Sequence, residues 1–578
     1  MLAPLQEGRI WTKQNLALWL GEAMLVILVA LAGLAYCFPL AFSQAETHIW
    51  SHTADPYALG DLGGALYMTV RSALGEVGCT ATTHGVPWSY DLCSEIPNPV
   101  VTDMLGGSVA RYGMPYGYNL GVVALLVSNG AAVYLATRLF GSSVWWALVG
   151  AIVATTAPSV VYEVEGGYVQ HVWWAPAIAG FALSLASVRS WRLLSLSILG
   201  GVLLAYSIPV YAMIPFMLLP WALMAGVVEL RGGHVDGLAE SSAVWRENLN
   251  RAVVGALIAV ICVLPQISSG LESAGPRLFE GSVNSSNLML GLEAFTTDDW
   301  FGMGVSGEEL VRSPGLLVWA LVVFSALGWR RAARFMPALL GGMLMLGISL
   351  GPSIAGEYRD WLPYVFMMEH VEIARGSMRP TRYGVAAVML FSVAMPIAAS
   401  AACERIRKPF LPVKKVMALS LAWFLILQIR PASVSQSLSW PPLPDVPNLE
   451  DDPINSEEVW LDLPVVGRGE NRFAQWAYNP APRMNPPHDI GQWRDQVRHS
   501  DFVLIDSLMA IGRGQEPEAA WLRALQVRVP EVVDQSLSQV VIHRGARSPS
   551  AERGWIEVLE LAGAERIVAN ERVFVFRF

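Results

Sequence analysis

The chain has 578 residues, of which 53% are hydrophobic and 15% are charged, and its formal net charge at pH 7 is −9. A soluble globular protein carries roughly a quarter charged residues, so this composition excludes an ordinary soluble enzyme. The acidic balance also excludes a basic nucleic-acid surface. The lipid bilayer is therefore the first expected partner, and no nucleic-acid partner is expected.

Long apolar stretches with almost no charge recur along the first 429 residues. A membrane-spanning helix needs about 20 apolar residues, and by this measure the sequence predicts a mainly α, polytopic bundle of about 11 spans. The predicted spans lie near residues 16–42, 119–138, 144–162, 171–188, 193–208, 209–229, 252–268, 314–329, 335–351, 383–403 and 415–429. The first stretch is long for a cleavable signal peptide, so we expect it to be retained as an anchor.

Positive charges concentrate in every second gap between these stretches. All four lysines, for example, fall in such gaps: Lys13, Lys408, Lys414 and Lys415. Because loops rich in Lys and Arg stay in the cytoplasm, the N-terminus is expected inside and, after 11 spans, the C-terminus outside. The gap at 43–118 is then a large external loop, far longer than an ordinary connection between helices, and this length suggests function.

The chain divides into three expected regions: a transmembrane core at 1–429, a proline-rich linker at 430–457 and a small external α/β domain at 458–578. Extended, proline-rich composition favours a stiff linker over a helix. In the external domain, short apolar runs predict strands at 458–464, 501–507, 539–545 and 573–578. Amphipathic patterns predict helices at 519–527 and 555–563.

The external loop contains two cysteines and a small group of metal-ligand residue types. Its compartment is oxidising, so a disulfide between Cys79 and Cys93 is expected, with two free thiols as the alternative. His48, His52 and Asp55 would share one helical face and are weak candidates for a metal site. The alternative is chance spacing, because the loop need not be helical.

The predicted spans contain almost no ionisable side chains, and Glu22 is the only acid well inside one. Ion-coupled transporters usually place acids or bases near the middle of the bilayer. The pattern therefore disfavours a transporter and favours chemistry at the outer face.

Three short motifs resemble those of a known group of membrane enzymes. They are GDLGGALY at 60–67, GGYVQHVWWAP at 166–176 and MRPTRYG at 378–384. Together with the large first external loop, they make the chain resemble the GT-C integral-membrane glycosyltransferases and, within them, bacterial YfhO-like proteins. In the second motif Tyr168 stands where the family pattern has histidine, which puts the role of that residue in doubt.

The resemblance implies transfer of a hexosyl or pentosyl group from a polyprenyl-phosphate sugar to a cell-envelope glycan, lipid or protein. The expected location is the outer face of a bacterial cytoplasmic (inner) membrane. The implied general base is Asp61, with Asp55 as runner-up and Asp103 as a supporting acid. A carboxylate at the membrane surface can accept the proton of the acceptor hydroxyl.

The same resemblance implies that Arg379 and Arg382 bind the donor phosphate, since a guanidinium group can hold phosphate with two hydrogen bonds. Tyr168, Gln170 and His171 are expected to line the substrate cavity. A divalent cation, Mg²⁺ or Mn²⁺, is the expected cofactor if one is used.

Each of these roles has a structural alternative. The three aspartates suit helix caps or turns, the two arginines can reach headgroup phosphates, and Gln170 and His171 can form interfacial hydrogen bonds. For the whole protein, the alternatives are a non-catalytic scaffold or assembly subunit of an envelope complex and a lipid-linked glycan transporter. Protein partners, the sugar and the acceptor are not evident from the sequence.

Overall fold

The structure is a computed structural model. It describes residues 13–51, 61–73, 80–81, 90–91, 99–167, 169–176, 178–179, 316–329, 335–354, 357–370, 381–404, 436–439, 459–463, 503–512, 514, 537–544, 547–569 and 573–578. The spans predicted at 193–208, 209–229, 252–268 and 415–429 lie outside these residues.

The chain forms two compact units. The first, here the helical unit, comprises Met1–Ser43, Pro97–Val101 and Asn119–Ser435. The second, here the mixed unit, comprises Gln44–Ile96, Thr102–Tyr118 and Gln436–Phe578. Each unit is described by itself.

The described helices of the helical unit confirm a membrane protein. Four helical segments are long and apolar enough to cross a bilayer: Leu20–Cys37, Tyr116–Leu139, Val144–Glu165 and Tyr383–Cys403. They belong to helices α2 (Lys13–Cys37), α6 (Tyr116–Leu139), α7 (Val144–Thr156) with α8 (Pro158–Glu165), and α20 (Thr381–Cys403). Two shorter apolar helices, α17 (Leu316–Gly328) and α18 (Met336–Ser349), also match predicted spans.

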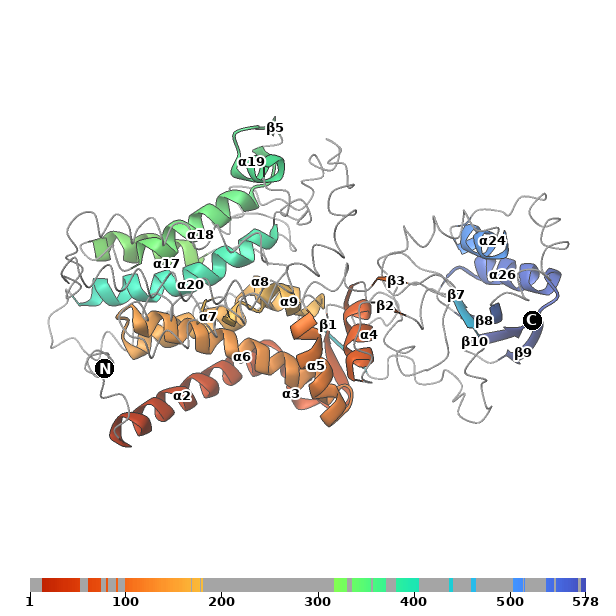
Figure 1. Cartoon of the computed structure of the whole chain (residues 1–578), viewed down its shortest axis with the longest axis horizontal. Coiled ribbons are helices and arrows are strands. Elements are labelled where there is room, and N and C mark those ends of the chain that lie inside the picture. Colours follow the sequence, from red (N-terminus) through yellow and green to blue (C-terminus); the bar gives the residue numbers. More distant parts are fainter. Residues whose placement is uncertain are drawn as a thin grey trace. The chain divides into compact units, whose positions relative to one another are not determined.

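Helix α20 is the centre of this packing, and its whole apolar segment is buried. Helices α7, α17 and α18 all contact it, and Figure 1 shows them running alongside it. Small residues allow the close approach: a Cβ on Gly150 of α7 would lie 2.5 Å from the carbonyl oxygen of Ser392. Such contacts are typical of membrane helices, which associate by close packing and not by hydrophobic exclusion.

The exposed side of this unit includes α2. Its side chains Leu20, Met24 and Leu28 are all more than half exposed. Apolar side chains that point away from the protein along a spanning helix are suited to contact with lipid chains.

Three predicted spans are interrupted in the structure. The first ends at Cys37 and is followed by α3 (Pro39–Ser43), and the third breaks at Ala157, where Pro158 begins α8. The predicted fourth span opens with the single turn α9 (Val169–Val172), after which Trp173 and Trp174 are not helical. Apolar periodicity does not reveal such breaks because the residues on both sides remain apolar.

The predicted external loops contain short elements. In the helical unit, β4 (Ser353–Ile354) pairs with β5 (Glu357–Tyr358), and α19 (Pro363–His370) follows. In the first loop, β1 (His48–Ser51) precedes α4 (Asp61–Ala73), β2 (Thr80–Ala81) pairs with β3 (Tyr90–Asp91), and α5 (Pro99–Tyr112) leads to α6.

One strand pair joins the first loop to the proline-rich linker. Strand β1 pairs antiparallel with β6 (Gln436–Ser439), with Ile49 opposite Leu438 and Trp50 opposite Ser437. Ile49, Trp50 and Ser51 are buried. The linker is therefore anchored at 436–439 by a backbone ladder.

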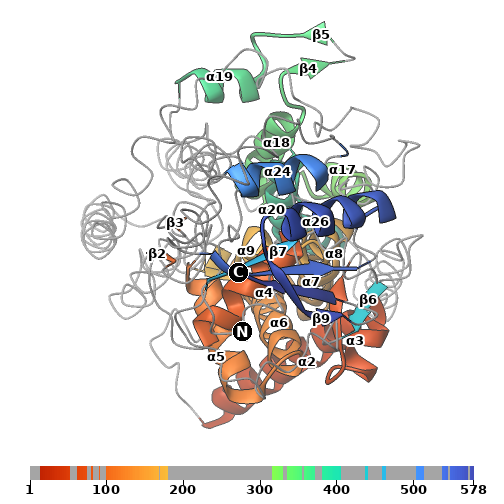
Figure 2. The same cartoon turned by 90° about the vertical axis from the view of Figure 1, so that its right-hand side faces the viewer.

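The C-terminal part forms a four-stranded sheet in the order β7–β8–β10–β9. Strand β7 (Val459–Leu463) is parallel to β8 (Leu537–His543), whereas β10 (Val573–Arg577) is antiparallel to both β8 and β9 (Glu565–Ala569). Helices α24 (Val503–Gly512) and α26 (Pro549–Leu561) lie together on one side of the sheet (Figures 1 and 2). The buried Trp555 joins them, since its Nε1 donates to the Leu508 carbonyl at 2.7 Å.

The strands expected near 458–464, 539–545 and 573–578 are present, and the helix expected at 555–563 is α26. Its end is marked by Gly563, whose φ of +86° is the left-handed conformation that glycine adopts easily. The strand expected at 501–507 is wrong, because these residues begin helix α24. Leu504, Leu508 and Ile511 recur at helical spacing and are all buried, whereas a short apolar run by itself suits either structure.

Candidate active site

Helices α8, α9 and α20 contact one another within the helical unit. The course of α7 and α8 along α20 can be followed from specific contacts: the Ser143 amide donates to Ser400 Oγ at 3.1 Å, and Gly150 faces Ser392. Because the two helices run antiparallel, α8 comes alongside the first turns of α20. Arg382 is the second residue of α20.

Two glutamates on α8 are buried at this junction. Glu163 is 3% exposed and Glu165 is 7% exposed. Gly166 and Gly167 follow directly, and the φ of +84° at Gly167 reverses the chain into α9, which carries Gln170 and His171. Buried carboxylates are rare in proteins unless they are paired or functional.

The break after α9 is held by α6. The side-chain amide of the fully buried Asn129 donates through Nδ2 to the Val172 carbonyl at 2.6 Å. Its Oδ1 accepts hydrogen bonds from the amides of Trp174 and Ala175 at 2.9 and 2.8 Å. This one side chain thus binds backbone groups on both sides of the interruption.

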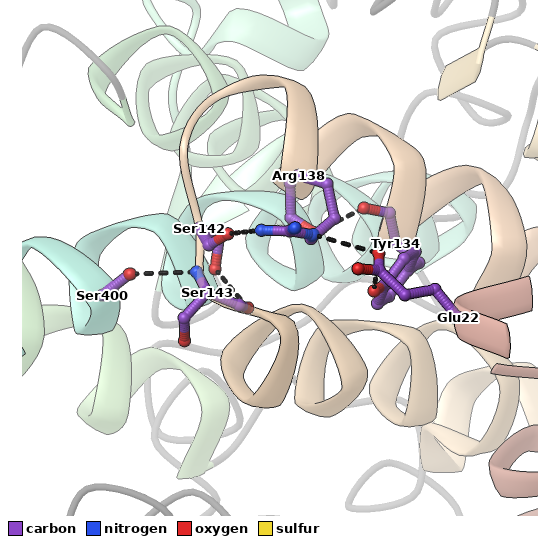
Figure 3. A network of polar contacts seen from close by, with 7 residues as sticks. Glu22, Tyr134, Arg138, Ser142, Ser143 and Ser400 are labelled. Carbon is purple, nitrogen blue, oxygen red and sulfur yellow. Dashed lines mark hydrogen bonds and ion pairs between the residues drawn. The ribbon is translucent and has the colours of Figure 1, made fainter. Parts of the chain in front are cut away.

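A separate polar network lies at the other end of α7 (Figure 3). Tyr134 Oη donates to Glu22 Oε2 at 2.6 Å, and Arg138 Nε lies 3.5 Å from the same oxygen. Arg138 Nη1 also donates to the Ser142 carbonyl at 2.6 Å, beside Ser143 and its contact with Ser400. At about 1.5 Å per helical residue, Val144–Glu165 places this network about 30 Å from the buried glutamates.

In the mixed unit, the two helices that carry predicted acids are joined by a hydrogen bond. Ser72 Oγ on α4 donates to Asp103 Oδ1 on α5 at 3.0 Å. Asp61 is the first residue of α4, a position compatible with the expected cap as well as with the general-base role. Asp103 is the fifth residue of α5, so the alternative that it caps a helix is wrong.

No family model matches the chain. No curated protein matches it either. Several solved structures match over nearly its whole length, at low sequence identity. One is the Archaeoglobus fulgidus oligosaccharyltransferase tethered with an acceptor peptide containing the NVT sequon, with a TM-score of 0.50, 11% identity, and coverage of 96% of this chain and 74% of that chain. Another is the arabinofuranosyltransferase AftD from Mycobacteria, with a TM-score of 0.51, 13% identity and coverage of 98% of this chain.

The chain has the fold of the GT-C membrane glycosyltransferases. The resemblance inferred from the three motifs is thereby confirmed at the level of the fold. The chain spans 42% of the length of AftD, so the likeness concerns the fold and a part of that larger protein.

The GT-C resemblance also assigned roles that stay predictions. Gln170 and His171 lie on α9, and Arg382 lies on α20; both helices contact α8. For these three residues only the backbone is described. The same holds for Asp61. Six residues of the predicted sites lie outside the described part of the chain, whether predicted from the resemblance or from the loop itself: Asp55, Arg379, Tyr168, Cys79, Cys93 and His52.

The helical arrangement suggested for a metal site does not apply to His48. This residue is in strand β1, and its Nδ1 lies 2.9 Å from Thr47 Oγ1. Among the residues that the structure describes, no three His, Cys, Asp or Glu side chains are grouped to hold a metal ion. Cys79 and Cys93 lie outside the described residues, so their predicted disulfide stays a prediction. The two cysteines that the structure describes, Cys37 and Cys403, are buried and form no disulfide.

Glu163 and Glu165 are the candidates that sequence reasoning missed. The predicted third span ended at residue 162, so both acids were assigned to a short loop, whereas the helix continues to Glu165. The available signal was the pair of acids, two residues apart, at the end of an apolar stretch and directly before Gly166. Asn129 was missed because a single amide in a span has no sequence signature of its partner.

Proposed function

We propose that the protein is a membrane glycosyltransferase that uses a polyprenyl-phosphate sugar at the outer face of a bacterial cytoplasmic membrane. The acceptor is a cell-envelope glycan, lipid or protein. The single observation that carries the proposal is the junction of α8, α9 and α20 in a GT-C fold. It brings the helix of two buried carboxylates to the helix whose second residue is Arg382.

The chemistry requires a cationic group for the phosphate and a base for the acceptor. An acceptor hydroxyl attacks the anomeric carbon of the sugar, the bond to the phosphate oxygen breaks, and polyprenyl phosphate leaves with the electron pair. The proton of the hydroxyl passes to a carboxylate, for which Asp61 is the first candidate. Arg379 and Arg382 would hold the donor phosphate.

A divalent cation fits the residues in one respect. The carboxylates of Glu163 and Glu165 are hard oxygen ligands of the kind that Mg²⁺ and Mn²⁺ prefer. The two residues are two positions apart on α8 and point to different sides of the helix, so the pair does not form one site. One of them would contribute a ligand to such an ion, and the ion would supply positive charge toward the phosphate of the donor. The charge of the arginines serves the same end without a metal.

The strand pair β1–β6 supports a common location for the first loop and the C-terminal domain. Strands joined by backbone hydrogen bonds must lie in the same compartment, so the chain crosses the membrane an even number of times between Ser51 and Gln436. The ten predicted spans that follow the first, from 119–138 to 415–429, satisfy this condition. The positive-inside rule then makes that compartment extracytoplasmic.

A test of the proposal is donor turnover by the purified protein in proteoliposomes. Release of polyprenyl phosphate from hexosyl and pentosyl donors is measured in the presence of cell-envelope glycan. We expect Asp61→Asn and Arg382→Ala to reduce turnover by about 100-fold or more, the usual scale of a lost acid–base group. Ser400→Ala is the matched control. Ser400 lies on α20 beside the start of α7, far from the junction, and this variant should stay near the wild-type rate.

Wild-type rates for both Asp61→Asn and Arg382→Ala would exclude the catalytic assignment. Absence of turnover with every donor, from a correctly folded wild-type protein, would favour the non-catalytic scaffold. A transporter would instead move an unmodified lipid-linked glycan between leaflets, and substitutions along the span interior would abolish this movement.

A further inference from the structure

Asn129 lies in the middle of α6, and its side chain replaces hydrogen bonds that an interrupted helix has lost. Val172 is the last residue of α9, so its carbonyl lacks a partner within that turn. Helical bonding resumes after the break, where the Ile178 amide donates to the Trp174 carbonyl at 3.0 Å. The amides of Trp174 and Ala175 therefore begin a new helical segment and donate to Oδ1 of Asn129 on α6.

The neighbouring Ser128 reinforces the same attachment. Trp173 Nε1 donates to Ser128 Oγ at 2.8 Å, and Ser128 Oγ donates to the Leu125 carbonyl at 2.6 Å. Two consecutive residues of α6 thus bind four consecutive residues of the broken segment, from Val172 to Ala175. Asn129, Val172 and Trp174 are all buried, so water does not offer an alternative partner at these groups.

The break determines the orientation of α9. If Trp173 and Trp174 became helical, α9 would join the following segment in one continuous helix. In such a helix the direction of α9 and the side on which the Gln170–His171 pair lies would be set by the helical repeat of about 100° per residue. In the broken arrangement they are set by the contacts of the break with α6.

We propose that Asn129 is a positioning residue for the transferase, which holds α9 in its broken arrangement beside α8 and α20. The inference rests on the proposed function, because α9 carries Gln170 and His171 and contacts the helix of Glu163 and Glu165. Asn129 itself acts through α9 and does not contact the substrate. An unpaired backbone group in an apolar surrounding is costly, so the break persists only where another helix provides partners.

The test compares Asn129→Leu with Asn129→Gln and with Ser400→Ala. Leucine matches asparagine in size but neither donates nor accepts, glutamine keeps the amide, and Ser400→Ala removes a polar contact at the other end of the unit. Donor turnover in proteoliposomes gives kcat and KM for each variant. Hydrogen exchange of the peptide that covers residues 166–179 reports the arrangement of the break without reference to activity.

We expect Asn129→Leu to lower kcat by about 10- to 100-fold with little change in the donor KM, since small misplacements of catalytic groups cost this much. Exchange at residues 172–175 should change in the same variant. Asn129→Gln should recover part of the rate, and Ser400→Ala should change neither property.

Unchanged hydrogen exchange in Asn129→Leu would show that Asn129 does not hold the break, whether or not the protein is a transferase. Changed exchange with an unchanged kcat would overturn the positioning role. If Ser400→Ala and Asn129→Leu lose the same thermal stability and the same donor turnover rate, the positioning role is also overturned. If the wild type turns over no donor, the proposed function fails. The hydrogen-exchange measurement still decides whether Asn129 holds the break.

Discussion

At the scale of single residues, the tertiary surroundings separate acids that look alike in the sequence. Glu22 lies in an apolar stretch, yet its carboxylate is bound by Tyr134 and Arg138, which gives it a structural role between α2 and α6. Glu163 and Glu165 are buried instead beside the glycine turn that leads to α9. A transporter is disfavoured by the scarcity of acids inside the predicted spans. Glu163 and Glu165 do not change this conclusion, because they lie at the end of a span and not near its middle.

A buried pair in the C-terminal sheet gives a prediction about stability. Asp462 Oδ1 and His543 Nε2 are 3.0 Å apart on the parallel strands β7 and β8, and each side chain is 3% exposed. Asp462→Ala removes a carboxylate from this pair and is expected to destabilise the domain by about 3 kcal/mol or more. Thermal or denaturant unfolding of the full-length protein in detergent measures the loss.

The control for this prediction is Glu560→Ala on the exposed side of α26, which should leave the unfolding transition within about 0.5 kcal/mol of the wild type. A double substitution, Asp462→Leu with His543→Phe, should recover part of the stability because it removes both polar partners together. Equal stability of Asp462→Ala and the wild type would refute the importance of the pair.

At the scale of elements, the ladder between β1 and β6 links the loop that carries Asp61 to the linker of the C-terminal domain. Neither strand has a distinctive sequence, and they lie almost 400 residues apart. The strand pair holds residues 436–439 of the linker against the first loop, so the linker is attached to this loop by backbone hydrogen bonds. This attachment suits a domain that binds the acceptor.

Proline substitutions in β6 test this attachment. Residues of an antiparallel pair alternate between hydrogen-bonded and non-bonded positions, so Ser437→Pro and Leu438→Pro serve as controls for each other. The variant that removes a ladder bond should become more sensitive to limited proteolysis within 430–457 and should lose donor turnover. If neither variant changes either property, the ladder has no role in holding the domain.

At the scale of the whole molecule, one GT-C fold is built from a helical unit with a buried α20 and a mixed unit with the first loop and the C-terminal sheet. The even number of crossings required by β1–β6 agrees with the orientation deduced from the positive charges. The proposed orientation then places the first loop and the C-terminal domain on the same, extracytoplasmic side.

Cysteine labelling tests the orientation. In a protein without its native cysteines, Glu46→Cys in the first loop and Glu560→Cys in the C-terminal domain are both exposed positions. A membrane-impermeant maleimide should label both in intact cells, because both are expected outside. Glu404→Cys, at the end of α20, should react only after permeabilisation. Labelling of Glu404→Cys alone in intact cells would reverse the proposed topology.

The sequence by itself determined that this is a helical membrane protein, that it resembles the GT-C membrane glycosyltransferases, and that an amphipathic helix lies near residues 555–563. Such features depend on local composition and period, which each segment carries within itself. Only the tertiary structure decided that 503–512 is a helix, that β1 meets β6, that Glu163 and Glu165 are buried and that Asn129 holds the break after α9. These features depend on partners 40 to almost 400 residues away, and a local pattern of apolar and polar residues contains no record of which distant group completes a hydrogen bond or covers a side chain.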